Sequence, residues 1–128
     1  PASGPKSLWP GLGRIVGKRL DPDGVSVKDL KERFLFTVAL EAARCMEEGI
    51  VTDPREADVG SILGFGYAPY SGGAISFIDG MGSKAFVARA KELASKYGRQ
   101  FEPSEKLAAM AERGETFYGK YGENEKAA

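Results

Sequence analysis

The glycine-rich segment 64–73 is the first place in this chain where residue types and spacing could support chemistry. It opens with Gly64-Phe65-Gly66, which begins like the turn that holds the pyrophosphate of a dinucleotide. That turn follows a strand, carries a third glycine three residues after the second, and leads into a helix. Here Pro69 stands in the third place, and the residues before Gly64 favour a helix. We therefore expect no nucleotide at this segment.

Acid–base and metal chemistry have few candidate residues. The chain contains no histidine and a single cysteine, Cys45. Histidine is the side chain that most often transfers protons near neutral pH, and it is the usual base that activates a cysteine. Transition-metal sites also depend on histidines or clustered cysteines. We therefore predict no catalytic, cofactor-binding or metal-binding residue and treat Cys45 as a small core side chain. Asp58 is interpreted as a carboxylate that either lies on a helix surface or holds a loop in place, and not as a catalytic residue.

The segment 64–73 has a stronger structural interpretation. Four glycines and a proline alternate there with three aromatic rings, a composition typical of a backbone that turns tightly while large apolar groups stay inside. We predict that this loop packs against another part of the protein, so aspartate at Gly66 or Tyr70 should lower stability by more than about 1 to 3 kcal/mol. The predicted packing residues are Gly64, Phe65, Gly66, Tyr67, Pro69, Tyr70, Gly72 and Gly73.

Length and charge limit the class of protein. A chain of 128 residues suits one domain, and its 18 basic and 18 acidic residues cancel. No net field then attracts nucleic acid or an anionic membrane, and no apolar run is long enough for a membrane span. The amino-terminal residues lack the apolar centre of a signal peptide, so we expect a cytoplasmic protein. Because the chain begins with Pro1 and its methionines are internal, we expect a piece of a longer polypeptide.

The longest predicted helix covers residues 26–48 and must position the loop. Ser26 can cap its amino terminus, with Asp29 three residues later in the acidic position of a capping box. Gly49 can end the helix in the left-handed conformation. Apolar residues recur at helical spacing and predict one buried face. This face carries Leu30, Phe34, Val38, Ala42 and Cys45, with Leu35, Leu40 and Met46 beside it.

Four shorter helices are expected after it, at about 54–63, 74–79, 83–97 and 104–113. Asp53 followed by proline signals the first start, and Ser83 is expected to cap the third helix. That third helix carries a basic face, which we interpret as solvated. Segment 74–79 could be a strand by periodicity alone, but its flanking helices favour a helix. No stretch shows the alternation of a strand, so the predicted fold is all-α with about five helices.

The two ends of the chain are expected to lie outside this helical domain. Residues 1–25 are rich in proline and glycine and predict an extended arm or linker. Within the arm, Trp9 belongs to an apolar stretch that cannot bury itself, so we predict that it docks onto the helices or onto a neighbouring domain. Residues 26–121 form the predicted domain, and residues 122–128 form a frayed tail.

Several motifs together resemble a known family. They are the segments 32–36, 39–49, 57–61, 64–73, 77–80 and 113–118, with the apolar stretch 8–12 upstream. In these segments the chain resembles the carboxy-terminal domain of the 3-hydroxyacyl-CoA dehydrogenases. The resemblance is greatest to the final domain of the multifunctional enzymes of fatty-acid β-oxidation, in which a segment similar to 8–12 connects the domains.

The resemblance implies a helical bundle like the carboxy-terminal domain of 6-phosphogluconate dehydrogenase. It also implies a parent enzyme that oxidises a 3-hydroxyacyl-CoA with NAD, often beside an enoyl-CoA hydratase. In the family, the NAD fold and the catalytic histidine–glutamate pair belong to an upstream domain, so no cofactor is expected in this chain. Catalytic relatives carry an asparagine before the arginine where this chain has Glu32 before Arg33, and a carboxylate cannot donate the hydrogen bond of an amide.

The resemblance therefore implies a noncatalytic structural copy of the helical domain. Its expected partners are the upstream NAD-binding domain, a sister helical domain of the parent, or a second copy in a homodimer. The alternative is a free-standing helical protein-interaction module without an enzymatic parent.

Overall fold

The computed structural model describes residues 7–17 and 21–122, and in these residues it contains helices and turns but no strand. Five of the α-helices have seven or more residues, which confirms the predicted all-α class and the number of main helices. The α-helices are α1 (Leu12–Val16), α2 (Val27–Glu47), α3 (Pro54–Phe65), α4 (Ala74–Met81), α5 (Ser83–Tyr97), α6 (Glu105–Arg113) and α7 (Phe117–Tyr121). Three short 3₁₀ turns join them: η1 (Pro22–Gly24), η2 (Pro69–Ser71) and η3 (Arg99–Phe101).

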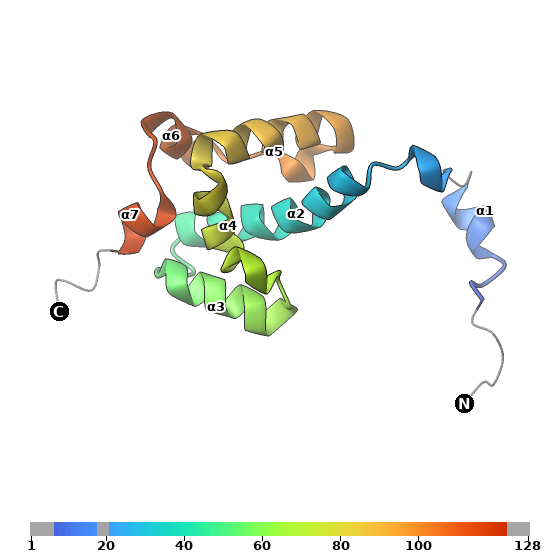
Figure 1. Ribbon diagram of the computed structural model, residues 1–128, viewed down its shortest axis with the longest axis horizontal. Helices are drawn as coiled ribbons and strands as arrows, with labels where there is room; N and C mark the ends of the chain where they lie inside the picture. Colours follow the sequence, from blue (N-terminus) through green and yellow to red (C-terminus); the bar gives the residue numbers. More distant parts are fainter. Residues whose placement is uncertain (1–6, 18–20, 123–128) are drawn as a thin grey trace.

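Helix α2 runs through the middle of the bundle, between α5 on one side and α3 on the other, and α4 crosses from α3 to α5 (Figure 1). At the centre, the ring of Phe36 stacks on that of Phe86 with 4.4 Å between centroids. The ring of Phe77 meets both edge-on, at 5.6 and 6.1 Å. Such aromatic packing adds to the apolar burial that holds α2, α4 and α5 together.

The predicted buried face of α2 is wrong in its central stripe, but Leu40 and Met46, which were predicted beside that stripe, are buried. The side of α2 that enters the core is another stripe of helical spacing, whereas Leu30 is 40% exposed and Phe34 is 72% exposed. Both stripes satisfy the same periodicity, and only the positions of α4 and α5 decide which one is covered. The buried stripe comprises Phe36, Ala39, Leu40, Ala43 and Met46.

The helix ends follow the predicted signals with two exceptions. The Oγ atoms of Ser26 and Ser104 accept hydrogen bonds from the backbone N–H groups three residues later, at 3.2 and 3.0 Å, as N-caps do. Helix α3 extends to Phe65, two residues beyond the predicted end, because Gly64 remains helical. Ser83 does not cap α5: it is the first helical residue, and Gly82 occupies the cap position without a side-chain bond.

The amino-terminal arm contains a short helix, α1, which lies away from the bundle (Figure 1). Trp9 is 66% exposed, so within the described residues it does not dock onto the helices; docking onto a neighbouring domain stays a prediction. Of the predicted frayed tail, only Gly122 lies within the described residues. No helix in residues 7–17 and 21–122 has the length and apolar character needed to cross a bilayer.

Candidate functional site

The glycine–aromatic loop joins α3 to α4. Gly66 ends α3 in the left-handed conformation, with φ of 70°, as glycine allows. Tyr67 is buried, its hydroxyl donates to the carbonyl oxygen of Leu35 on α2 at 3.2 Å, and burial raises its pKa. Phe65 and Tyr70, however, are 77% and 83% exposed. The expectation that all three rings lie inside is therefore correct for Tyr67 alone, and the buried-charge argument does not apply at Tyr70.

A buried carboxylate, Asp58 of α3, organises this loop. Its Oδ1 accepts hydrogen bonds from the backbone N–H groups of Ile75 and Ser76, at 2.7 and 3.0 Å. Its Oδ2 accepts from the hydroxyls of Ser76 and Tyr118, at 2.5 and 2.7 Å. The negative charge thus takes the place of a side-chain cap at the amino terminus of α4, where the helix dipole favours it. The loop-holding interpretation of Asp58 agrees with these contacts.

Only glycine fits at position 73, before the start of α4, because the backbone there lies close to Asp58. Gly73 has φ of 123°, and a Cβ there would lie 2.6 Å from the Cα of Asp58 and overlap its side chain. The hydroxyl of Ser61 accepts from the next backbone N–H, that of Ala74, at 3.1 Å. Because Asp58 already occupies the first amide donors of α4, the residues of this loop do not fit the pyrophosphate of NAD.

Sequence reasoning missed a second capping carboxylate, Asp79 near the end of α4. Its two oxygens accept hydrogen bonds from the backbone N–H groups of Phe117 and Tyr118, at 2.9 and 3.0 Å. Together with the contact between Asp58 and Tyr118, these bonds attach α7 to α3 and α4. The resemblance contained a signal for this pairing, since both Asp79 and segment 113–118 lie in its motifs.

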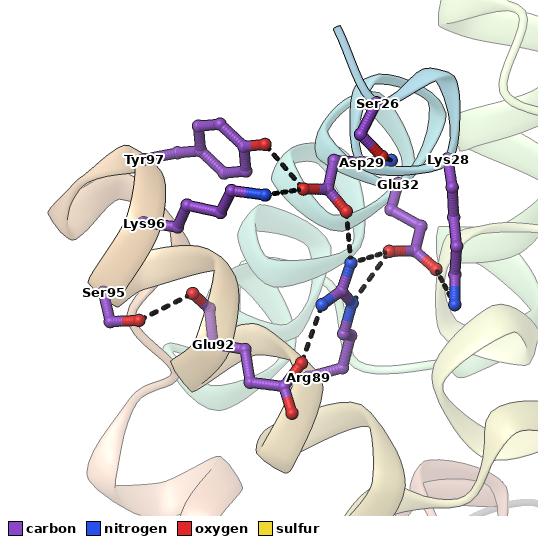
Figure 2. A network of polar contacts seen from close by, with 9 residues as sticks. All are labelled: Ser26, Lys28, Asp29, Glu32, Arg89, Glu92, Ser95, Lys96 and Tyr97. Atoms are coloured by element: carbon purple, nitrogen blue, oxygen red, sulfur yellow. Dashed lines mark hydrogen bonds and ion pairs between the residues drawn. The ribbon is translucent and has the colours of Figure 1, made fainter. Parts of the chain in front are cut away.

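A polar network joins the amino-terminal end of α2 to α5, and Figure 2 shows Arg89 at its centre. The guanidinium of Arg89 donates to Asp29 Oδ1 at 2.7 Å and, through Nε, to Glu32 Oε2 at 2.8 Å. The other oxygen of Asp29 accepts from Lys96 and Tyr97. Hydrogen bonds from Lys96, Tyr97 and Arg89, in that order of effect, hold the pKa of the Asp29 carboxyl well below its usual range.

This network corrects two expectations. Arg89 and Lys96 belong to the basic face of α5 that was interpreted as solvated, yet both pair with Asp29 of α2. Asp29 also stands in the acidic position of the predicted capping box, but its carboxylate faces α5 instead. Glu32, which stands where catalytic relatives are expected to carry an amide, is held by Arg89. The structure thus gives Glu32 a structural contact.

This network should make the free energy of unfolding depend on pH. In the unfolded chain Asp29 binds a proton near its ordinary pKa of about 3.9, whereas in the folded chain its lowered pKa delays protonation to lower pH. Below about pH 4 the unfolded state therefore binds more protons, so the free energy of unfolding should fall as the pH falls.

Urea midpoints between neutral pH and about pH 2 should drop less steeply for Asp29→Asn than for the unchanged chain. Asp23→Asn, an exposed carboxylate outside the network, is the control and should follow the unchanged chain; equal slopes for Asp29→Asn would contradict the assignment.

Other sequence candidates are not brought together into a reactive site. Cys45 is a free thiol on the partly exposed side of α2, not a fully buried core residue as expected. Within residues 7–17 and 21–122, no group of three or more histidine, cysteine, aspartate or glutamate side chains could hold a metal ion. What the bundle does present is a set of exposed apolar side chains on α2, α3 and the following loop: Leu30, Phe34, Leu63, Phe65 and Tyr70. Of these, Phe34 and Phe65 line one hollow between α2 and the end of α3.

Comparison with known proteins agrees with the sequence resemblance. No family model matches the chain. Over 104 residues, 81% of this chain, it is 38% identical to the fatty acid oxidation complex subunit alpha of Shewanella loihica. Over 95 residues, 74% of this chain, it is 40% identical to the protein of the same name from Shewanella amazonensis. The matches span only 15% and 14% of those two proteins. The chain is therefore a homologue of one segment of the fatty acid oxidation complex alpha subunit, which confirms the predicted resemblance.

Proposed function

We propose that this chain is a noncatalytic, carboxy-terminal structural domain of an NAD-dependent 3-hydroxyacyl-CoA dehydrogenase that acts in fatty-acid β-oxidation. Two alpha subunits of fatty acid oxidation complexes, each several times longer than this chain, support the parent assignment. The observation that carries the noncatalytic role is the pairing of Glu32 with Arg89. A carboxylate held by a guanidinium cannot donate a hydrogen bond to a substrate.

In this proposal the domain supports the parent enzyme by packing. The exposed side chains Phe34 and Phe65 line one hollow and form an apolar surface of the kind that marks protein contacts. The partner would be a sister helical domain of the parent or a second copy of this one. NAD would bind in an upstream domain, where its redox chemistry takes place, and this chain would contribute no direct contact to it.

The purified chain, mixed with NAD and a 3-hydroxyacyl-CoA, should form no NADH above the rate without protein. The sequence contains no histidine, the side chain that most often accepts such a proton, and the resemblance assigns the catalytic histidine to an upstream domain. Absorbance at the NADH band measures the reaction. Turnover that scales with protein concentration would overturn the noncatalytic role.

The parent assignment needs a separate test. In the Shewanella loihica subunit, the segment matched by this chain can be exchanged for this chain. The chimera should keep its dehydrogenase activity, because the two segments are 38% identical and would fold alike. A folded chimera that has lost this activity would contradict the proposal. The rival role, a free-standing interaction module, rests on the same exposed surface. It predicts that the upstream coding sequence does not encode a strand followed by a glycine-rich nucleotide fingerprint.

A further inference from the structure

We propose that the amino-terminal arm of one copy of this chain, residues 8–16, binds the groove between α2 and α3 of a second copy. Both surfaces are exposed in a single chain, and both are apolar, so each would bury the other when they bind. The proposal goes beyond the enzymatic assignment and does not depend on it.

The arm presents an apolar side that its own chain leaves uncovered. Helix α1 buries none of its residues, and Trp9, Ile15 and Val16 are 66%, 73% and 65% exposed. The Trp9 ring lies over Gly11, where a Cβ would come within 2.7 Å of the ring atom Cε2, so the ring has a defined place. Leu12 and Val16 lie four residues apart on α1, and Trp9, which precedes the helix, lines the same hollow with them. Side chains four residues apart on a short helix can serve as anchors in an apolar groove.

The groove is apolar and large enough for such anchors. It encloses about 480 Å³, in the range of cavities that bind sizeable groups. Val38, Ala42 and Cys45 of α2 form one wall, while Ala57 and Phe65 of α3 form the other. This includes part of the α2 stripe that the sequence predicted to be buried. Its apolar character is explained if a second molecule covers it.

The charged residues around the groove favour the arm over apolar ligands that carry a negative charge. The two charged residues that line the groove, Glu41 and Glu56, are both acidic. Glu41 is paired with Arg44 at 2.8 Å, so Glu56 is the residue that would repel a fatty acid carboxylate or the phosphates of a coenzyme A ester. The single charged residue of segment 8–16 is Arg14 of α1, which is basic. An apolar segment with one basic residue therefore matches an apolar groove lined by acidic residues.

The start of α2 favours a second copy over the arm of the same chain. Asp21 accepts from the backbone N–H groups of Asp23 and Gly24, at 3.1 and 3.0 Å, and so fixes the η1 turn before α2. Beyond that turn α1 lies away from the bundle, past the amino-terminal end of α2 (Figure 1), whereas Cys45 lies near the other end. A two-fold exchange gives each arm a groove without reversing this turn.

Sedimentation velocity and the fluorescence of Trp9, the single tryptophan, test the proposal on the full chain. As the concentration rises from micromolar toward millimolar, dimer should form and the Trp9 emission should shift to shorter wavelength over the same range. Val16→Asp, in the arm and outside the bundle, should weaken dimer formation at least about tenfold and abolish the shift. Val27→Asp, an exposed apolar position at the start of α2 that does not line this groove, is the matched control and should change neither.

A charge exchange identifies the contact between the two copies. Arg14→Glu should weaken the dimer, and adding Glu56→Arg should restore it, because the pair then attracts again. A chain that stays monomeric overturns the proposal. An emission shift that does not depend on concentration overturns it in favour of the chain's own arm. A dimer that resists Val16→Asp but is lost in Phe34→Asp, an exposed position outside this groove, also overturns it and points to a different face; none of these outcomes changes the turnover tests of the proposed function.

Discussion

Asp58→Ala should lower the free energy of unfolding by about 3 to 5 kcal/mol. The carboxylate is 3% exposed and accepts from two backbone N–H groups at the start of α4, those of Ile75 and Ser76. Alanine would leave both donors without a partner in a site that water hardly reaches. A hydrogen bond to a charged group contributes roughly 1.5 to 3 kcal/mol, and unpaired buried donors retain their desolvation cost. The hydroxyl of Tyr118 would lose its acceptor as well, so α7 would loosen.

Urea unfolding followed by circular dichroism measures this effect. Asp58→Asn keeps one acceptor oxygen for the amides of α4 but removes the charge, so it should cost less than alanine, about 1 to 2 kcal/mol. Glu112→Gln, an exposed carboxylate on α6, should stay within about 0.5 kcal/mol of the unchanged chain. If Asp58→Ala unfolds at the same urea concentration as Glu112→Gln, the carboxylate does not hold the loop.

Local signals in the sequence predicted the helices well because their causes are local. A serine cap acts on a backbone N–H three residues away, and a left-handed glycine acts on the turn before it. Ser26, Ser104 and Gly49 each behave in this way in the structure. Ser83 failed as a cap because α4 and α5 are nearly continuous, so Gly82 takes the cap position.

The face of α2 that is buried could not be predicted from local signals in the same way. Its apolar residues satisfy helical spacing on two sides, one through Phe34 and one through Phe36. Periodicity identifies an apolar stripe, but the covering helices are contributed by residues far along the chain, such as Phe77 and Phe86. The partners of Asp29 show the same limit, because Arg89 and Lys96 follow it by 60 and 67 residues.

The loop was predicted in part. Its tight glycine turn and the inward position of Tyr67 follow from composition, but the exposure of Phe65 follows from the continuation of α3 through Gly64. A glycine followed by an aromatic residue suggests a loop in sequence, yet glycine is tolerated near a helix end at a cost of about 1 kcal/mol. The glycines of this segment therefore differ in how well they should tolerate a side chain: Gly64 lies within α3, whereas Gly73 lies against Asp58.

Gly73→Ala should lower the free energy of unfolding by at least about 3 kcal/mol. Its φ of 123° lies in a region that residues with a side chain rarely adopt, which alone costs of order 1 to 3 kcal/mol. The added Cβ would also meet Asp58, whose Cα would be 2.6 Å away. Because Asp58 is held in place by the amides of Ile75 and Ser76, it cannot move aside without giving up the cap of α4.

Gly64→Ala is the matched comparison and should act in the opposite direction. Gly64 is helical, and a Cβ there would meet nothing within 4 Å. Alanine should therefore raise the free energy of unfolding by about 0.4 to 1 kcal/mol, mainly by reducing the freedom of the unfolded chain. The two substitutions add the same methyl group to glycines of one short segment, so a difference in sign isolates the close approach of α4 to Asp58. If Gly73→Ala is tolerated as well as Gly64→Ala, Asp58 and the start of α4 are not in the contact described.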